Sequence, residues 1–246
     1  MTLIEACVDT LASAHAAEEG GADRIELCAD LADGGTTPSH GTITVVTEQL
    51  DIPVVVLIRP RGGGFVYTAA ECAIMRRDVQ HARALGARGV AVGALTPNGD
   101  IDTFTTETLR EAARDMDVTF HRAFDVCRDP FAALEALQRI GVTRILTSGQ
   151  RASAVEGAAL LAELVRRAAG KIGIMAGGGV DEANAAELVR STGVTEIHVR
   201  GTRQLTEQVV FHDHPVPFRK ALPDDETVRC VTDVERLKAI RTALAG

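Results

Sequence analysis

Eight short apolar runs alternate with longer helical patterns along the chain, and this alternation restricts the fold more than any other feature. Strands that alternate with helices form βαβ units around a parallel sheet. Eight such units predict an α/β fold, a single closed (β/α)8 or TIM barrel. An open doubly wound sheet is the weaker alternative, because no phosphate-binding turn follows the first run. The runs cover residues 3–8, 24–28, 54–59, 89–95, 118–122, 144–148, 172–178 and 196–200.

An internal repeat supports the barrel. The segments "GADRIELC", "GARGVAVG", "GVTRILTS" and "GVTEIHVR" share a glycine that ends a helix, a short turn and a strand. They contribute to the second, fourth, sixth and eighth runs, so the repeating unit is a pair of βα modules. We therefore expect one TIM-barrel domain over 1–246, with its site at the C-terminal mouth, a long loop over 201–230 and a final helix over 232–244.

Charge and composition exclude several classes of protein. A net charge of −8 without a Lys/Arg run argues against nucleic-acid binding. No apolar run approaches the ~20 residues that span a bilayer, so no membrane partner is expected. The first ten residues lack a basic segment, which favours a cytoplasmic protein over a secreted one. The five cysteines are scattered and odd in number, and this indicates free thiols.

The alternation of strand side chains sorts the charged residues by depth. Aligning the repeats places Arg24, Arg144 and Glu196 at the closed end of the barrel, where a structural ion cluster is favoured. Glu26 and His198 lie nearer to the mouth, where barrel enzymes hold their sites. These two are better candidates for acid/base chemistry.

Two cysteines occupy equivalent positions at the ends of the first two strands. Cys7 follows Glu5 on one face of the first strand, as Cys28 follows Glu26 on the second. Parallel neighbours lie about 4.8 Å apart, so the two sulfurs could approach each other at the mouth. A pair of thiolates suits Cu(I). The alternative is a pair of small buried residues, because free cysteine is commonly buried.

The third strand ends in "IRPRGGGFVY", which contains Arg59 and Arg61. A proline stops the strand, and three glycines allow a tight turn beside the mouth. Two arginines there suggest a carboxylate or phosphate held by forked hydrogen bonds. The alternative is a pair of ion bridges to Glu5 or Glu26.

Polar and glycine-rich segments follow the sixth, seventh and eighth strands. In many barrels the backbone N–H groups of the last two loops hold a phosphate. "TSGQ" adds polar side chains at the mouth, without a base that would make its serine a nucleophile. The candidate anion-binding residues in these loops are Ser148, Gln150, Gly177, Gly178 and Gly201.

The fifth strand ends in "TFHRAFD", which places His121 and Asp125 at the functional end of a barrel strand. His121 is a candidate for proton transfer. Beyond the eighth strand, "FHDHPVP" contains His212 and His214, which could chelate a metal or belong to a lid. A solvated loop is the favoured interpretation of that segment.

Taken in order along residues 4 to 199, the motifs resemble those of the CutC family, known as copper homeostasis proteins. The motifs are "IEAC", "GADRIELC", "GGTTPS", "IRPRGGGFVY", "TFHRAFD", "ILTSGQ", "IMAGGGV" and "EIHV". The resemblance implies a (β/α)8 barrel, a cytoplasmic location and a homo-oligomer. It also implies copper as a cofactor or cargo, with Cys7 and Cys28 as Cu(I) ligands.

Two hypotheses on function remain open, and they are compatible with each other. The first is a Cu(I)-binding protein of copper homeostasis. The second is a TIM-barrel enzyme that acts by acid/base chemistry on a small anionic metabolite such as a sugar or sugar phosphate, with Arg59 and Arg61 holding the anion. Its candidate catalytic residues are Glu5, Glu26, His121, Asp125 and His198.

Overall fold

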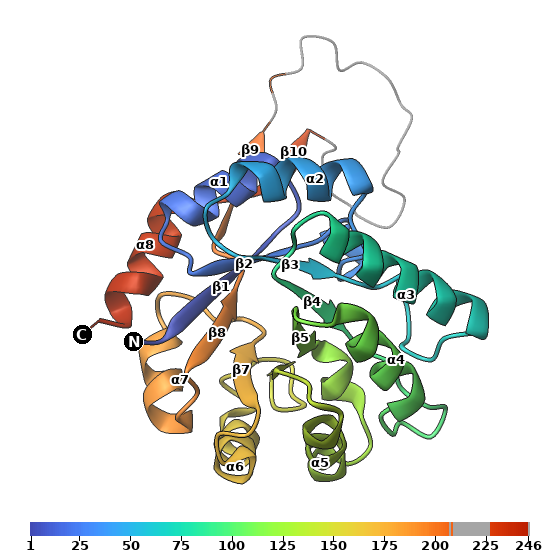
Figure 1. The fold of residues 1–246 in the computed structure, drawn as a ribbon. Helices are drawn as coiled ribbons and strands as arrows, with labels where there is room; N and C mark the ends of the chain where they lie inside the picture. Colours follow the sequence, from blue (N-terminus) through green and yellow to red (C-terminus); the bar gives the residue numbers. More distant parts are fainter. Residues whose placement is uncertain (207, 209–226, 246) are drawn as a thin grey trace.

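The computed structural model describes residues 1–206, 208 and 227–245. Within this part of the chain, eight parallel strands form a closed barrel in the order β1 to β8, and helices surround it (Figure 1). The predicted (β/α)8 barrel is confirmed. The strands are β1 (Leu3–Val8), β2 (Arg24–Leu27), β3 (Val54–Leu57), β4 (Gly89–Val92), β5 (Asp117–Phe120), β6 (Arg144–Thr147), β7 (Gly173–Gly177) and β8 (Glu196–Val199).

Local signals in the sequence start and stop the helices around the barrel. Thr68 and Glu71 form a capping box at the start of α3. Gly141 and Gly193 end α5 and α7 in the left-handed region, with φ of 79° and 74°, as the repeat predicted. The helices are α1 (Leu11–Glu19), α2 (His40–Gln49), α3 (Ala69–Ala84), α4 (Thr103–Ala113), α5 (Pro130–Ile140), α6 (Ala158–Ala168), α7 (Ala185–Thr192) and α8 (Val234–Ala243), with short 3-10 helices η1 (Leu31–Asp33) and η2 (Arg122–Val126).

The main hydrophobic core lies between the barrel and the helices. Strand residues that point outward from the barrel are fully buried there, for example Ile25, Val90 and Ile145. The barrel interior is thus left to the strand side chains that point inward.

None of the helices in the described ranges has both the length and the apolar character that crossing a bilayer requires.

The closed end of the barrel contains the predicted ion cluster. Arg24 pairs with both Glu5 and Glu196, and Arg144 pairs with Glu196 and Asp117. Closure of the barrel creates the contact between Arg24 and Glu196, because it pairs β8 with β1 and brings Glu196 beside Leu3 in the register. Mutual pairing compensates the cost of burying these charges.

The segment after β8 is not a loop over its whole predicted range of 201–230. The strands β9 (Thr202–Thr206) and β10 (Val228–Thr232) form a two-stranded antiparallel sheet. Pairing satisfies backbone groups that a loop would leave to water, and β10 also contacts α1. The final helix α8 lies within the predicted 232–244. His212 and His214 lie outside the described residues.

Candidate metal and ligand site at the barrel mouth

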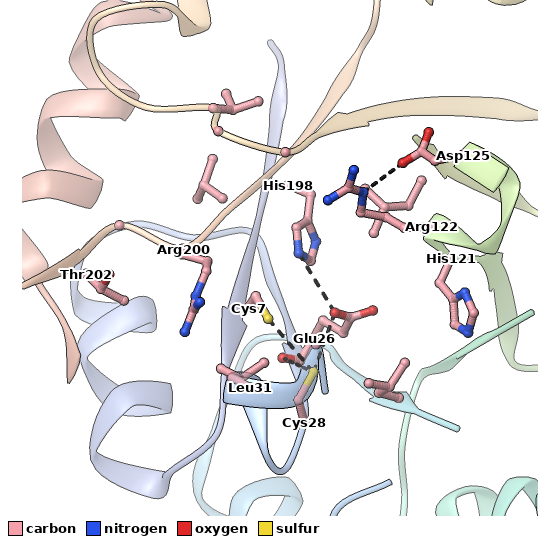
Figure 2. A pocket seen from close by; sticks show the side chains of 18 of the residues that line it. Cys7, Glu26, Cys28, Leu31, His121, Arg122, Asp125, His198, Arg200 and Thr202 are labelled. Carbon is pink, nitrogen blue, oxygen red and sulfur yellow. Dashed lines mark hydrogen bonds and ion pairs between the residues drawn. The ribbon is translucent and has the colours of Figure 1, made fainter. Parts of the chain in front are cut away.

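A cavity of about 650 Å³ lies at the C-terminal ends of the barrel strands. This is where TIM barrels carry their sites. Figure 2 shows side chains from several strands and from the loops that follow them around this space. Of the candidate residues predicted from the sequence, Cys7, Glu26, Cys28, Arg59, His121, Asp125, Gly178, His198 and Gly201 line the cavity.

The two predicted cysteines meet at the base of the cavity. Their sulfurs are 3.8 Å apart, and both side chains are buried. A hydrogen bond from Cys28, aided by His198, outweighs burial and lowers the pKa of Cys7 to about 5. The same hydrogen bond and burial raise the pKa of Cys28 well above the usual range of a thiol. At neutral pH the pair therefore holds one thiolate and one thiol.

Glu26 and His198 lie beside the cysteine pair. Burial raises the pKa of Glu26 to about 8, although the charge of His198 opposes this shift. For His198, burial opposes the charged form, but hydrogen bonds to Cys7 and Glu5 outweigh it and raise the pKa well above the usual value. One donor atom from each of Cys7, Glu26 and His198 lies within 4.8 Å of the other two. This set offers a sulfur, an oxygen and a nitrogen to one ligand.

Glu5 lies below the cavity and does not line it. One of its carboxylate oxygens is 2.9 Å from Nδ1 of His198, and the other pairs with Arg24. Burial would raise the pKa of Glu5, but the His198 hydrogen bond and the Arg24 charge outweigh it and lower this pKa to about 2. A permanent carboxylate at Nδ1 fixes the orientation of His198, so that its Nε2 faces Glu26 at 3.8 Å.

His121 faces the cavity from the end of β5. Its Nδ1 accepts a hydrogen bond from the backbone N–H of Ala123 at 3.1 Å. Burial, together with the positive charge of Arg59, lowers the pKa of His121 to about 3. The imidazole is therefore neutral at physiological pH. Its ring packs against Phe65 at a centroid distance of 5.2 Å.

The guanidinium groups of the two arginines after β3 are not available to bind an anion in the cavity. Arg59 lines it, but its terminal nitrogens donate to the carbonyl oxygens of Asp33, Gly35 and Gly63 at 2.7 to 2.8 Å. The glycine-rich turn folds back and supplies one of these acceptors. Arg61 lies outside the lining and pairs with Glu71, so neither the predicted anion clamp nor the alternative bridges to Glu5 and Glu26 form.

Asp125 reaches the cavity wall but is occupied by the loop after β6. Its carboxylate accepts hydrogen bonds from the backbone N–H groups of Ser148 and Gln150 and from the hydroxyl groups of Thr147 and Ser148. It also pairs with Arg122. These contacts favour a structural role for Asp125. They also hold Ser148 and Gln150 away from the cavity lining, in which the sequence had placed them.

The loops after β7 and β8 form the opposite wall. Gly178 and Gly201 line the cavity as predicted, whereas Gly177 faces Leu146 inside the barrel. The sequence argument did not select Arg200, which lines the cavity directly after β8 (Figure 2). Alternation along the strand places Arg200 on the same inward-facing side as His198, and this pattern was the signal that could have identified it.

A closed (β/α)8 barrel with two buried, adjacent cysteines at its C-terminal mouth defines a barrel protein with a thiol-lined cavity. The sequence profile of the CutC family matches residues 2–203. A CutC family protein from Pasteurella multocida is 45% identical over 241 residues, which covers 98% of both chains. The human copper homeostasis protein cutC homolog is 43% identical, covering 97% of this chain and 87% of its own. This chain belongs to the CutC family.

Solved structures agree with this assignment. A CutC protein from Streptococcus agalactiae is 38% identical with a TM-score of 0.78, and the match covers 80% of this chain and 98% of the other. Phosphoribosylanthranilate isomerase from Thermotoga maritima matches over 100% of both chains with a TM-score of 0.59 at 12% identity. The second likeness concerns the fold alone.

Proposed function

We propose that this chain binds Cu(I) as a cargo of copper homeostasis, with Cys7 and Cys28 as its ligands. The observation that carries the proposal is the buried pair of sulfurs 3.8 Å apart at the open end of the barrel. Thiolates are soft ligands that select Cu(I) over hard cations. The lowered pKa of Cys7 supplies one thiolate at neutral pH without the help of a metal.

The neighbours of the pair fit a bound soft metal. Bonds of about 2.3 Å, the length of a Zn–S bond, reach from two sulfurs at this separation to one ion. His198 offers a ring nitrogen within 4.8 Å of the Cys7 sulfur, and Glu5 holds that ring in place through Nδ1. The names of relatives, among them the human copper homeostasis protein cutC homolog, agree with such a cargo.

The double variant Cys7→Ser, Cys28→Ser should lose stoichiometric Cu(I) binding while it stays folded. Anaerobic titration against a chromophoric Cu(I) chelator measures the affinity, and circular dichroism checks the fold. Affinity of the wild type should rise with pH through the neutral range, because Cys28 has a raised pKa and must lose its proton to bind.

The matched control for this titration is the double variant Cys72→Ser, Cys230→Ser, which removes two thiols that do not line the cavity. This variant should bind Cu(I) like the wild type. Equal affinity of the two double variants would contradict the proposal.

A second function is favoured by the size of the cavity. A volume of about 650 Å³ lies within the 300–1,000 Å³ that is typical of small-molecule sites, and it is far larger than one ion needs. We propose that the cavity also holds a small anionic metabolite, such as a sugar phosphate, for acid/base chemistry. Glu26, protonated near neutrality, would be the acid/base group. Arg200 and the glycines after β7 and β8 would hold the anion.

Addition of inorganic phosphate to the metal-free protein should raise its melting temperature, because a ligand that binds only the folded state stabilises it. The variant Arg200→Gln should lose most of this stabilisation. Lys171→Gln, at an exposed position between α6 and β7, serves as the charge-matched control and should keep it. An unchanged melting temperature of the wild type would count against the anion site.

The proposal includes a cytoplasmic location and assembly into a homo-oligomer. All five cysteines belong to the described residues and are free thiols, as a reducing cytoplasm favours. A homo-oligomer stays a prediction, supported by the exposed Phe104 and Ile74 on α4 and α3. Light scattering on the purified protein measures the assembly directly.

A further inference from the structure

Three buried polar atoms around the cavity have no hydrogen-bond partner within the described residues. They are Oε1 of Glu26, Nε of Arg59 and Nε2 of His121, and all three residues line the cavity. Buried polar groups in native proteins are nearly always paired, so an unpaired one points to a missing water, ion or ligand. His121 is the most informative of the three, because its protonation can be worked out from a single contact.

The backbone fixes the tautomer of His121. The N–H of Ala123 can only donate, so Nδ1 of His121, which receives it, carries no proton. A neutral imidazole with a bare Nδ1 carries its proton on Nε2. The unpaired atom is therefore a hydrogen-bond donor, and in this tautomer it cannot accept a proton from a substrate.

The surroundings of the ring hold this donor in place. A Cβ atom at Gly93, at the end of β4, would lie 2.3 Å from Cε1 of His121, so only glycine leaves room for the imidazole. The ring of Phe65 packs against the imidazole of His121. The guanidinium of Arg59 in turn lies over the Phe65 ring, 5.4 Å from its centroid. A neutral, rigid donor of this kind is preorganised for an oxygen on which charge develops.

We propose that Nε2–H of His121 donates a hydrogen bond to the carbonyl oxygen of the metabolite, so that the substrate class is a small carbonyl compound with an anionic group. This inference rests on the second function proposed above. In the view of Figure 2, His121 and Arg200 lie on opposite sides of Glu26. One molecule would thus present its anionic group to Arg200 and its carbonyl group to His121.

The chemistry that this arrangement supports is proton transfer beside the carbonyl group. The carboxylate form of Glu26 removes a proton from the adjacent carbon, the electrons of that C–H bond form a C=C bond, and the C=O π electrons move to oxygen. His121 stabilises the resulting enolate oxygen through Nε2–H, as neutral imidazoles at the start of a helical turn do in other barrels. Glu26 then returns the proton to carbon, so no oxidant or further reactant is required.

The test uses the metal-free, reduced full chain with ¹⁵N-labelled histidine and two probes, hydroxyacetone phosphate and propyl phosphate. The probes differ only at the second carbon, which carries a carbonyl oxygen in the first and no oxygen in the second. NMR should show His121 with its proton on Nε2. The ketone should shift that nitrogen and bind at least about tenfold more tightly, which is the discrimination of one well-formed hydrogen bond.

Two variants separate the donor from the fold. His121→Gln places an amide donor near the position of Nε2 and should keep the preference for the ketone. His121→Asn keeps an acceptor for the Ala123 N–H but loses the donor, and it should bind both probes equally. Thermal melting checks that both variants are folded.

A proton on Nδ1, or equal binding of the two probes to the wild type, would overturn the inference and leave the anion site standing. Binding of neither probe would overturn the second function and this inference together. The copper proposal is independent of each outcome, because no metal is present in the experiment.

Discussion

Replacing Arg24 with methionine should lower the free energy of unfolding by about 3–5 kcal/mol, the usual effect of removing one partner from a buried ion pair. Arg24 is 5% exposed and pairs with both Glu5 and Glu196. Without it, the fully buried carboxylate of Glu5 keeps His198 as its one charged partner among the residues that the structure describes. Methionine fills a similar volume, so the loss reports the charge and not a cavity.

Urea denaturation at pH 7, followed by circular dichroism, measures the effect of Arg24→Met. The double variant Arg24→Met, Glu5→Gln should recover part of the loss, because a neutral amide replaces the uncompensated charge. The lowered pKa of Glu5 adds a pH signature. Its contribution is fully present above the unfolded-state pKa near 4.5 and disappears as the pH falls towards 2, so wild type and variant should converge over this window. A loss below about 1 kcal/mol at pH 7 would show that the cluster contributes little.

Replacing Asp125 with alanine should lower the free energy of unfolding by about 3 kcal/mol or more, because several donors lose a charged acceptor at once. These donors include the backbone N–H groups of Ser148 and Gln150. They belong to a turn in which Gln150 has a positive φ of 56°, a conformation that needs support in a residue other than glycine. The loop after β6 should therefore loosen.

Hydrogen exchange of the Ser148 and Gln150 amides measures this loosening, and urea denaturation measures the stability. The control Asp125→Asn keeps one acceptor oxygen and should lose about half as much free energy of unfolding as the alanine variant. Unchanged exchange in Asp125→Ala would exclude the structural role and return Asp125 to the candidates for chemistry.

The barrel and the cysteine pair could be predicted because both depend on local periodicity. Alternation of strands and helices sets the fold, and Cys7 and Cys28 meet because both point into the barrel from neighbouring strands. Their predicted equivalence was wrong in detail, because the register pairs Cys7 with Glu26. The partners of Glu5 could not be found in this way. His198 is 193 positions away in the sequence, and it becomes a neighbour only because β8 closes against β1.

The roles of Arg59 and Asp125 were missed for a related reason. Both lie at the end of a barrel strand, as catalytic residues do, and the sequence predicts their position correctly. Their hydrogen-bonding capacity, however, is taken up by loops that fold back over the strand ends. The path of such a loop depends on tertiary packing, which periodicity does not record.

The contact between His198 and Glu5 joins the last barrel strand to the first, and this has a consequence for the chain as it leaves the ribosome. Both sulfur atoms emerge within the first 28 residues, long before His198, which aids the Cys28 hydrogen bond in lowering the pKa of Cys7. Until the eighth strand closes the barrel, neither the Cys28 thiol nor His198 is held beside Cys7, and the two thiols should keep the ordinary acidity of a free cysteine. A growing chain would therefore hold soft metal ions only weakly, and the finished molecule would gain this capacity in the last step of its folding.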